Sequence, residues 1–134
     1  MVALTQTPAN VDGYSDLTSE YVQGGEAISA GMPVELNVNG KYYKAANTGL
    51  AEAAAKGIAI SACTADTKYF FIGKTGSMDI GATLAVGENY CVGASGAIIP
   101  EADLTTSNFP TNLGRAETAS KLVLAIKALG VAHA

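Results

Sequence analysis

The chain has 134 residues, enough for one domain but too few for two independent hydrophobic cores. A net charge of −4, a single arginine (Arg115) and the absence of a basic run argue against nucleic-acid binding. The 24 alanines and 15 glycines contribute little apolar side-chain surface. We therefore predict a thin core that gains stability by oligomerising or by docking on a larger structure.

The N-terminal residues predict neither export nor membrane insertion. Residues 1–10 lack the positive segment and the apolar segment of a secretion signal, and no apolar run reaches the length of a membrane span. We expect the protein to act in the compartment where it is made. Residues 1–21 show no sustained periodicity and contain Pro8 and Gly13, which predicts an irregular arm or a frayed terminus. Residues 22–134 are predicted to form one β-rich domain.

The first clear strand signal is a predicted hairpin. Residues 33–38 alternate apolar and polar side chains, which places Val34, Leu36 and Val38 on the face expected to be buried. An Asn-Gly pair at 39–40 separates this run from a run with two tyrosines. Because both residues of the pair tolerate a positive φ, the pattern predicts a tight hairpin turn.

Short strands separated by glycines are predicted for most of the remaining chain. They are residues 57–62, 68–72, 77–80, 84–86, 89–92, 97–99 and 113–117. Residues 50–55 have high helix propensity and predict a short helical turn or an ordered loop. Residues 121–129 fit a helix about as well as a strand, and we predict a strand because it suits the rest of the chain. The fold class is therefore mainly β, as a compact barrel or sandwich.

The sequence offers little for catalysis or metal binding. The only histidine, His133, is the penultimate residue, where a rigid second shell is rarely available. Cys63 and Cys91 match no zinc or redox spacing, and we expect two buried free thiols rather than a disulfide. No catalytic residue, metal site or cofactor is predicted, and the protein is expected not to be an enzyme.

Aromatic residues concentrate in two of the predicted strands. Alternation sends Tyr42 and Tyr43 to opposite faces, and it separates Phe70 from Tyr69 and Phe71 in the same way. One set should enter the core. The other is either further core packing or a surface covered by a partner, because tyrosine and phenylalanine favour buried interface centres.

Several glycine-containing segments resemble one known group of proteins. They include Gly-Glu-Ala-Ile-Ser-Ala-Gly-Met-Pro-Val at 25–34, Val-Gly-Glu-Asn-Tyr-Cys-Val-Gly at 86–93, Gly-Ala-Ile-Ile-Pro at 96–100 and Leu-Gly-Arg-Ala at 113–116. Through these segments, residues 24–130 resemble small bacteriophage head-decoration proteins, also called capsid cement proteins.

The resemblance implies a small β-barrel or β-tulip-like domain that acts as a homotrimer on the outer surface of an icosahedral phage head. The partner would be the major capsid protein, the protein would be made in the host cytoplasm, and no cofactor would be needed. The irregular arm would help attach the module to the capsid, through Leu4, Thr5, Pro8, Val11, Tyr14, Leu17 and Tyr21. Subunits would meet through Tyr42, Tyr43, Tyr69 and Phe71.

A second hypothesis remains open from the sequence. The same tyrosines, together with the polar loop at 105–112, fit a host-recognition or carbohydrate-binding module of a phage fibre.

Overall fold

The computed structural model describes residues 4–49, 53–104 and 108–128. Within them the regular structure is mainly β-strand, which confirms the predicted fold class. The strands are β1 (Val11–Gly13), β2 (Thr18–Gln23), β3 (Pro33–Leu36), β4 (Tyr42–Lys44), β5 (Ala55–Ala59), β6 (Tyr69–Ile80), β7 (Asn89–Val92), β8 (Ile98–Pro100), β9 (Thr111–Thr118) and β10 (Lys121–Ala128). Two short 3-10 helices, η1 (Pro8–Asn10) and η2 (Glu101–Asp103), complete the described elements.

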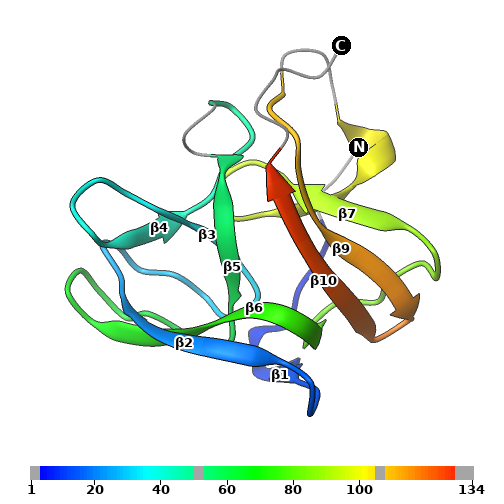
Figure 1. Cartoon of the computed structure of the whole chain (residues 1–134), viewed down its shortest axis with the longest axis horizontal. Coiled ribbons are helices and arrows are strands. Elements are labelled where there is room, and N and C mark those ends of the chain that lie inside the picture. Colours follow the sequence, from blue (N-terminus) through cyan, green and yellow to red (C-terminus); the bar gives the residue numbers. More distant parts are fainter. Residues whose placement is uncertain (1–3, 50–52, 105–107, 129–134) are drawn as a thin grey trace.

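The long strand β6 organises the sheet. Its first part pairs with β2 and with β5, and β5 continues through β3 to β4. Its last part pairs with β1 and with β10, and β10 continues through β9 and β7 to β8. All these pairings are antiparallel, and the strands curl into an open half-barrel with β6 running across its base in Figure 1.

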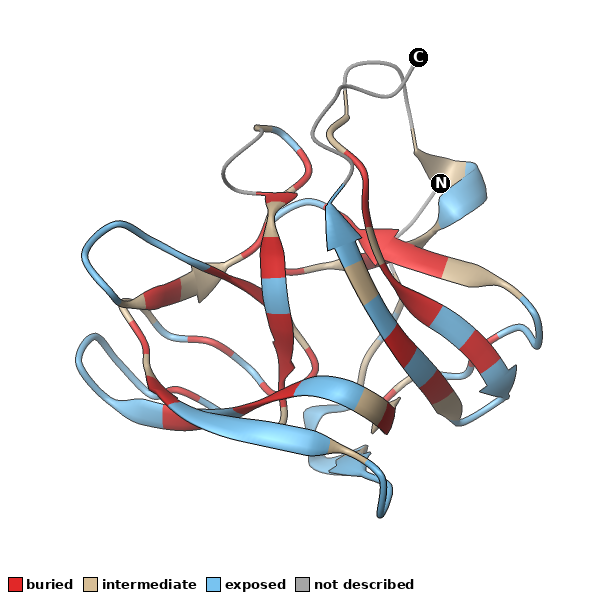
Figure 2. Cartoon of the chain, viewed as in Figure 1, coloured by how far each residue is buried: buried red, intermediate tan, exposed pale blue. Residues whose placement is uncertain are grey.

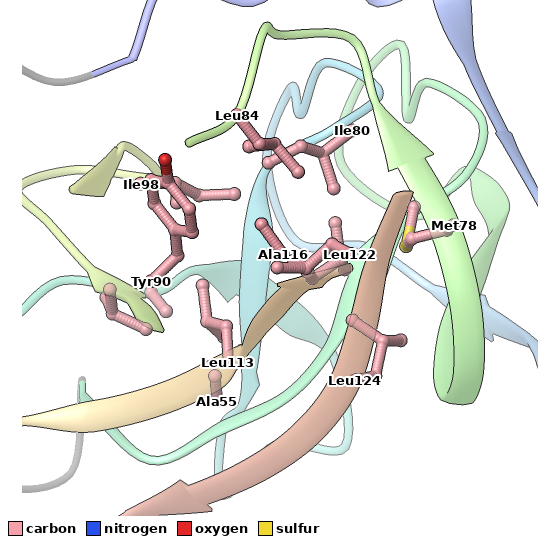
Figure 3. Packing of buried hydrophobic residues seen from close by; sticks show 13 residues of the cluster. Ala55, Met78, Ile80, Leu84, Tyr90, Ile98, Leu113, Ala116, Leu122 and Leu124 are labelled. Carbon is pink, nitrogen blue, oxygen red and sulfur yellow. The ribbon is translucent and has the colours of Figure 1, made fainter. Parts of the chain in front are cut away.

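Two hydrophobic clusters fill the two halves of this curled sheet. The larger is built mainly from β6, β7, β9 and β10, and Figure 3 shows Met78, Leu113 and Leu122 directed into it. The smaller gathers Phe70 and Ile72 of β6 with Val34 of β3. Alanine occupies three buried positions in the larger cluster and one in the smaller, and it contributes little apolar surface to either.

The alternation expected of half-buried strands is clearest in β10. Leu122 and Leu124 are buried while Val123 and Ala125 are exposed, as the red and blue bands of β10 show in Figure 2. This confirms a strand rather than a helix near the C-terminus. The predicted strands at 89–92, 97–99 and 113–117 correspond to β7, β8 and β9 with small shifts of their ends.

The prediction of an irregular arm through residue 21 was wrong in two segments. Residues 11–13 form β1 and residues 18–23 form β2, and both pair with β6. The preceding residues are also attached, because Gln6 donates from Nε2 to the carbonyl oxygens of Gly31 and Ile80, both at 2.8 Å. The regular pairing was missed because β2 is exposed along most of its length and so lacks an apolar alternation.

The predicted hairpin is confirmed, with Leu36 of β3 opposite Tyr42 of β4, but its details differ. Gly40 has a positive φ of 82° and Asn39 does not, and the Asn37 amide bonds the Lys41 carbonyl at 2.9 Å, so the loop is longer than a two-residue turn. The loop leaves Leu36 and Val38 exposed, contrary to the predicted buried face.

Three other boundaries also differ from prediction. Gly73 and Gly76 do not end a strand, because β6 continues through both to Ile80. Residues 84–86 are not a strand, although Leu84 is buried. In the predicted turn at 50–55, Ala55 already belongs to β5, and residues 50–52 lie outside the described residues.

Gly76 is where β6 changes partners. Its φ is +103°, a conformation that side chains other than glycine rarely adopt, and a Cβ there would overlap the Asp16 carbonyl. Asp16 in turn holds the next residue, because its carboxylate accepts bonds from the Ser77 amide and hydroxyl at 3.1 Å. Glycine therefore lets the turn between β1 and β2 lie against the strand.

Gly76→Ala is expected to lower the free energy of unfolding by at least about 2 kcal/mol, through backbone strain plus the clash with residue 16. Gly40→Ala is the matched control, because Gly40 also has a positive φ but a Cβ there meets nothing within 4 Å. The control should cost only about 1 kcal/mol. Urea unfolding followed by circular dichroism measures both, and equal losses would contradict a special role for Gly76.

Candidate functional site: an exposed aromatic face

Three aromatic side chains gather on the solvent side of β2 and β6. Tyr21 lies directly opposite Phe71 in the strand register, and Tyr69 is two residues before Phe71 on the same face. The ring centroids of Tyr21 and Phe71 are 4.6 Å apart, and those of Tyr21 and Tyr69 are 5.4 Å apart. We call Tyr21, Tyr69 and Phe71 the aromatic face.

The aromatic face is open to solvent although its members are large. Tyr21 is 59% exposed, Tyr69 is 53% exposed and Phe71 is 46% exposed. Phe70, between the last two, points the other way and is fully buried in the smaller cluster. Because Phe70 is anchored in the core, it holds the part of the β6 backbone that carries Tyr69 and Phe71.

The backbone beneath the aromatic face is also held on its second edge. The Phe71 amide donates to the Ser61 hydroxyl at 3.0 Å, and the Ile60 amide donates to the Phe71 carbonyl at 2.8 Å. Gln23 extends β2 beyond the rings and donates from its side chain to the Thr67 carbonyl at 3.1 Å. Tyr69 and Phe71 thus stand on a strand that is paired on both edges, and Tyr21 stands on β2, the strand paired with it on one edge.

Of the four residues predicted to form a subunit interface, only Tyr69 and Phe71 lie on this face. Tyr42 is buried within the smaller cluster, where burial and the nearby Glu20 carboxylate raise the pKa of its hydroxyl. Tyr42 is therefore a core residue, which corrects its predicted place in the subunit interface. Tyr43 is half-buried and covers Gly25 so closely that a Cβ there would overlap its ring.

The residues predicted for capsid attachment separate into two groups. Leu4, Val11 and Leu17 pack against the larger hydrophobic cluster, so their apolar surface is already partly used within the fold. All three remain partly exposed, so their role in capsid attachment stays a prediction. Thr5, Pro8, Tyr14 and Tyr21 are exposed.

Tyr14 belongs to a separate part of the surface. Its ring lies 5.2 Å from the Lys121 ammonium, and its hydroxyl lies 3.3 Å from the Ser120 carbonyl oxygen that accepts its bond. Only Tyr21 of the predicted attachment residues joins the aromatic face.

The described residues hold no cluster of three or more histidine, cysteine, aspartate or glutamate side chains that could bind a metal ion. Nor does any helix in the described ranges have the length and apolar character needed to cross a membrane. His133 lies outside the described residues.

The two cysteines are buried and free, which confirms the expectation of two separate thiols. Burial raises the pKa of the Cys91 thiol to about 11, and the carboxylates of Glu101 and Glu88 add to the shift. A thiol that remains protonated at neutral pH is a poor nucleophile.

No protein-family model matches this chain, and no curated protein sequence matches it. The structure therefore assigns the chain to a fold class only, that of a small, mainly β, curled half-barrel.

Cys91 is expected to remain unmodified by iodoacetamide at pH 8 in the folded protein and to react readily in 8 M urea, because burial keeps the thiol protonated. Its alkylation in the folded state should rise only as the pH approaches the raised pKa of about 11. Peptide mass mapping after timed alkylation measures this. Rapid labelling of Cys91 at pH 8 without unfolding would contradict the buried, protonated thiol.

Proposed function

We propose that this protein is a structural module of a phage virion, which binds the outer surface of an icosahedral head as a homotrimer and stabilises the shell. The observation that supports the proposal best is the aromatic face, a set of large apolar side chains left exposed on a rigid strand pair. The resemblance of residues 24–130 to head-decoration proteins supports the choice of partner.

The aromatic face has the properties of a protein contact. Aromatic residues are enriched at the buried centres of interfaces, and rigid backbone lowers the entropic cost of association. Covering the exposed half of each ring would contribute on the order of 1 kcal/mol. Three rings per subunit, repeated in a closed trimer, would contribute enough to matter for a domain whose own core is thin.

The arrangement of the rings favours this use over sugar binding. A sugar platform presents ring faces to the ligand beside hydrogen-bonding groups. Here Tyr21 packs on both neighbours, with interplanar angles of 27° to Tyr69 and 39° to Phe71, so the rings partly cover one another. The fibre hypothesis therefore becomes an outcome of the test below.

The mechanism needs no chemical step. A module that binds only the assembled, expanded shell stabilises that state by mass action. Three linked contacts in one trimer raise the effective concentration of each, so that individually weak contacts suffice.

The intact protein is expected to have three times the subunit mass of 13.6 kDa by size exclusion with light scattering. A Tyr21→Ser/Phe71→Ser variant should lose this assembly, because serines remove the apolar contact. Val38→Ser/Val86→Ser is the matched control, because these valines are at least as exposed but lie outside the aromatic face. Circular dichroism checks that each variant is folded.

Co-sedimentation with expanded phage heads that lack the decoration protein tests the partner. The intact protein and the valine control should sediment with the heads, and the aromatic variant should remain in the supernatant. An intact protein that is monomeric and does not bind heads contradicts the proposal. Binding to host cells or to glycans in the absence of heads would instead support the fibre module.

A further inference from the structure

Strands β5 and β10 both pair with the same edge of β6 and then leave it. Ile58 of β5 lies opposite Gly73, and Leu124 of β10 lies opposite Gly76, so the fork begins at the two residues between them, Lys74 and Thr75. In the described residues β5 and β10 form no ladder with each other. In Figure 1 both strands rise from β6.

The space between the two strands is a pocket of about 590 Å³, which we call the β5–β10 wedge. Its floor includes Leu124 and Ile126, which also contact the larger hydrophobic cluster. Each bordering strand is paired on its far edge, β5 with β3 and β10 with β9, whereas the near edges face the opening. The wedge is therefore bordered by two strand edges that face each other.

Three lysines line the wedge, and no acidic residue lines it. They are Lys56, Lys74 and Lys127, from a chain with eight basic residues and a net charge of −4. Lys74 pairs with Glu20 at 3.0 Å. Within the described part of the chain, Lys56 and Lys127 are exposed and pair with no carboxylate. The local charge thus opposes that of the whole protein.

We propose that the β5–β10 wedge binds an extended acidic segment of a partner polypeptide, which adds to the sheet as a short strand. The strand edges would supply backbone donors and acceptors, and alternate side chains of the segment would lie on the apolar floor. The lysines would pair with its carboxylates and reject basic segments. The wedge shares no residue with the aromatic face, and this binding requires neither a trimer nor a phage head.

The probe is a peptide of alternating glutamate and valine with blocked ends, titrated into the full ¹⁵N-labelled chain and followed by amide chemical shifts. We expect saturable shifts concentrated at residues 55–57 and 124–128, which border the wedge. A peptide of alternating lysine and valine should cause none. An acidic peptide methylated at alternate backbone nitrogens should bind much more weakly, because it has lost the donors that a strand needs.

Lys56→Glu/Lys127→Glu should weaken binding of the acidic peptide by more than roughly fivefold, since two attractive contacts become repulsive. The control variant is Lys68→Glu/Arg115→Glu, which has the same net charge as the wedge variant but changes exposed residues outside the wedge. It should bind the acidic peptide as well as the unmodified chain does. The proposal is overturned if shifts are absent or lie elsewhere, if both variants weaken binding equally, or if the basic or methylated peptide binds as well.

Discussion

The whole fold depends on one strand that exchanges partners along its length. β6 pairs with β2 and β5 before Gly76 and with β1 and β10 around and after it, so it is shared by both halves of the sheet. The exchange requires the positive φ of Gly76 and the close approach of the turn at Asp16. The same exchange creates the fork between β5 and β10, since both strands meet β6 on one edge but cannot both continue along it. The wedge is thus a geometric result of the bend in β6.

A thin core and exposed binding surfaces are related properties here. Alanines at buried positions keep the sheet layers close but provide little hydrophobic stabilisation, while large aromatic side chains remain outside at Tyr21, Tyr69 and Phe71. A protein that folded only for its own stability would gain by burying these rings. Their placement on β6 and on its partner β2 reserves apolar surface for association, and paired strands keep that surface rigid at little cost in ordering entropy.

The sequence predicted strands from short apolar runs between glycines and lost accuracy where a strand carries few apolar side chains. β7 is such an apolar run and is largely buried, whereas β2 is exposed along most of its length and was assigned to an irregular arm. The strand at β10 was predicted only because it suited the rest of the chain, since its apolar positions fit a helix about as well. The glycines in β6 looked like strand ends because their use at a bend depends on a turn some sixty residues earlier in the chain. Tyr69 and Phe71 could be proposed as exposed from their alternation with Phe70. Their meeting with Tyr21 could not, because it depends on a register that only the folded sheet defines.

The attachment of the first residues has a consequence for biosynthesis. Gln6 bonds the carbonyl of Ile80, and the Leu4 amide bonds that of Ile98, so the chain start is held by residues far along the sequence. A ribosome delivers Ile80 and Ile98 long after Leu4 and Gln6, which leaves these two residues without their native partners until much of the chain has emerged. Closing such long loops is entropically expensive and slows folding. During translation Leu4 and Gln6 would therefore be available to chaperones and proteases until Ile80 and Ile98 have emerged.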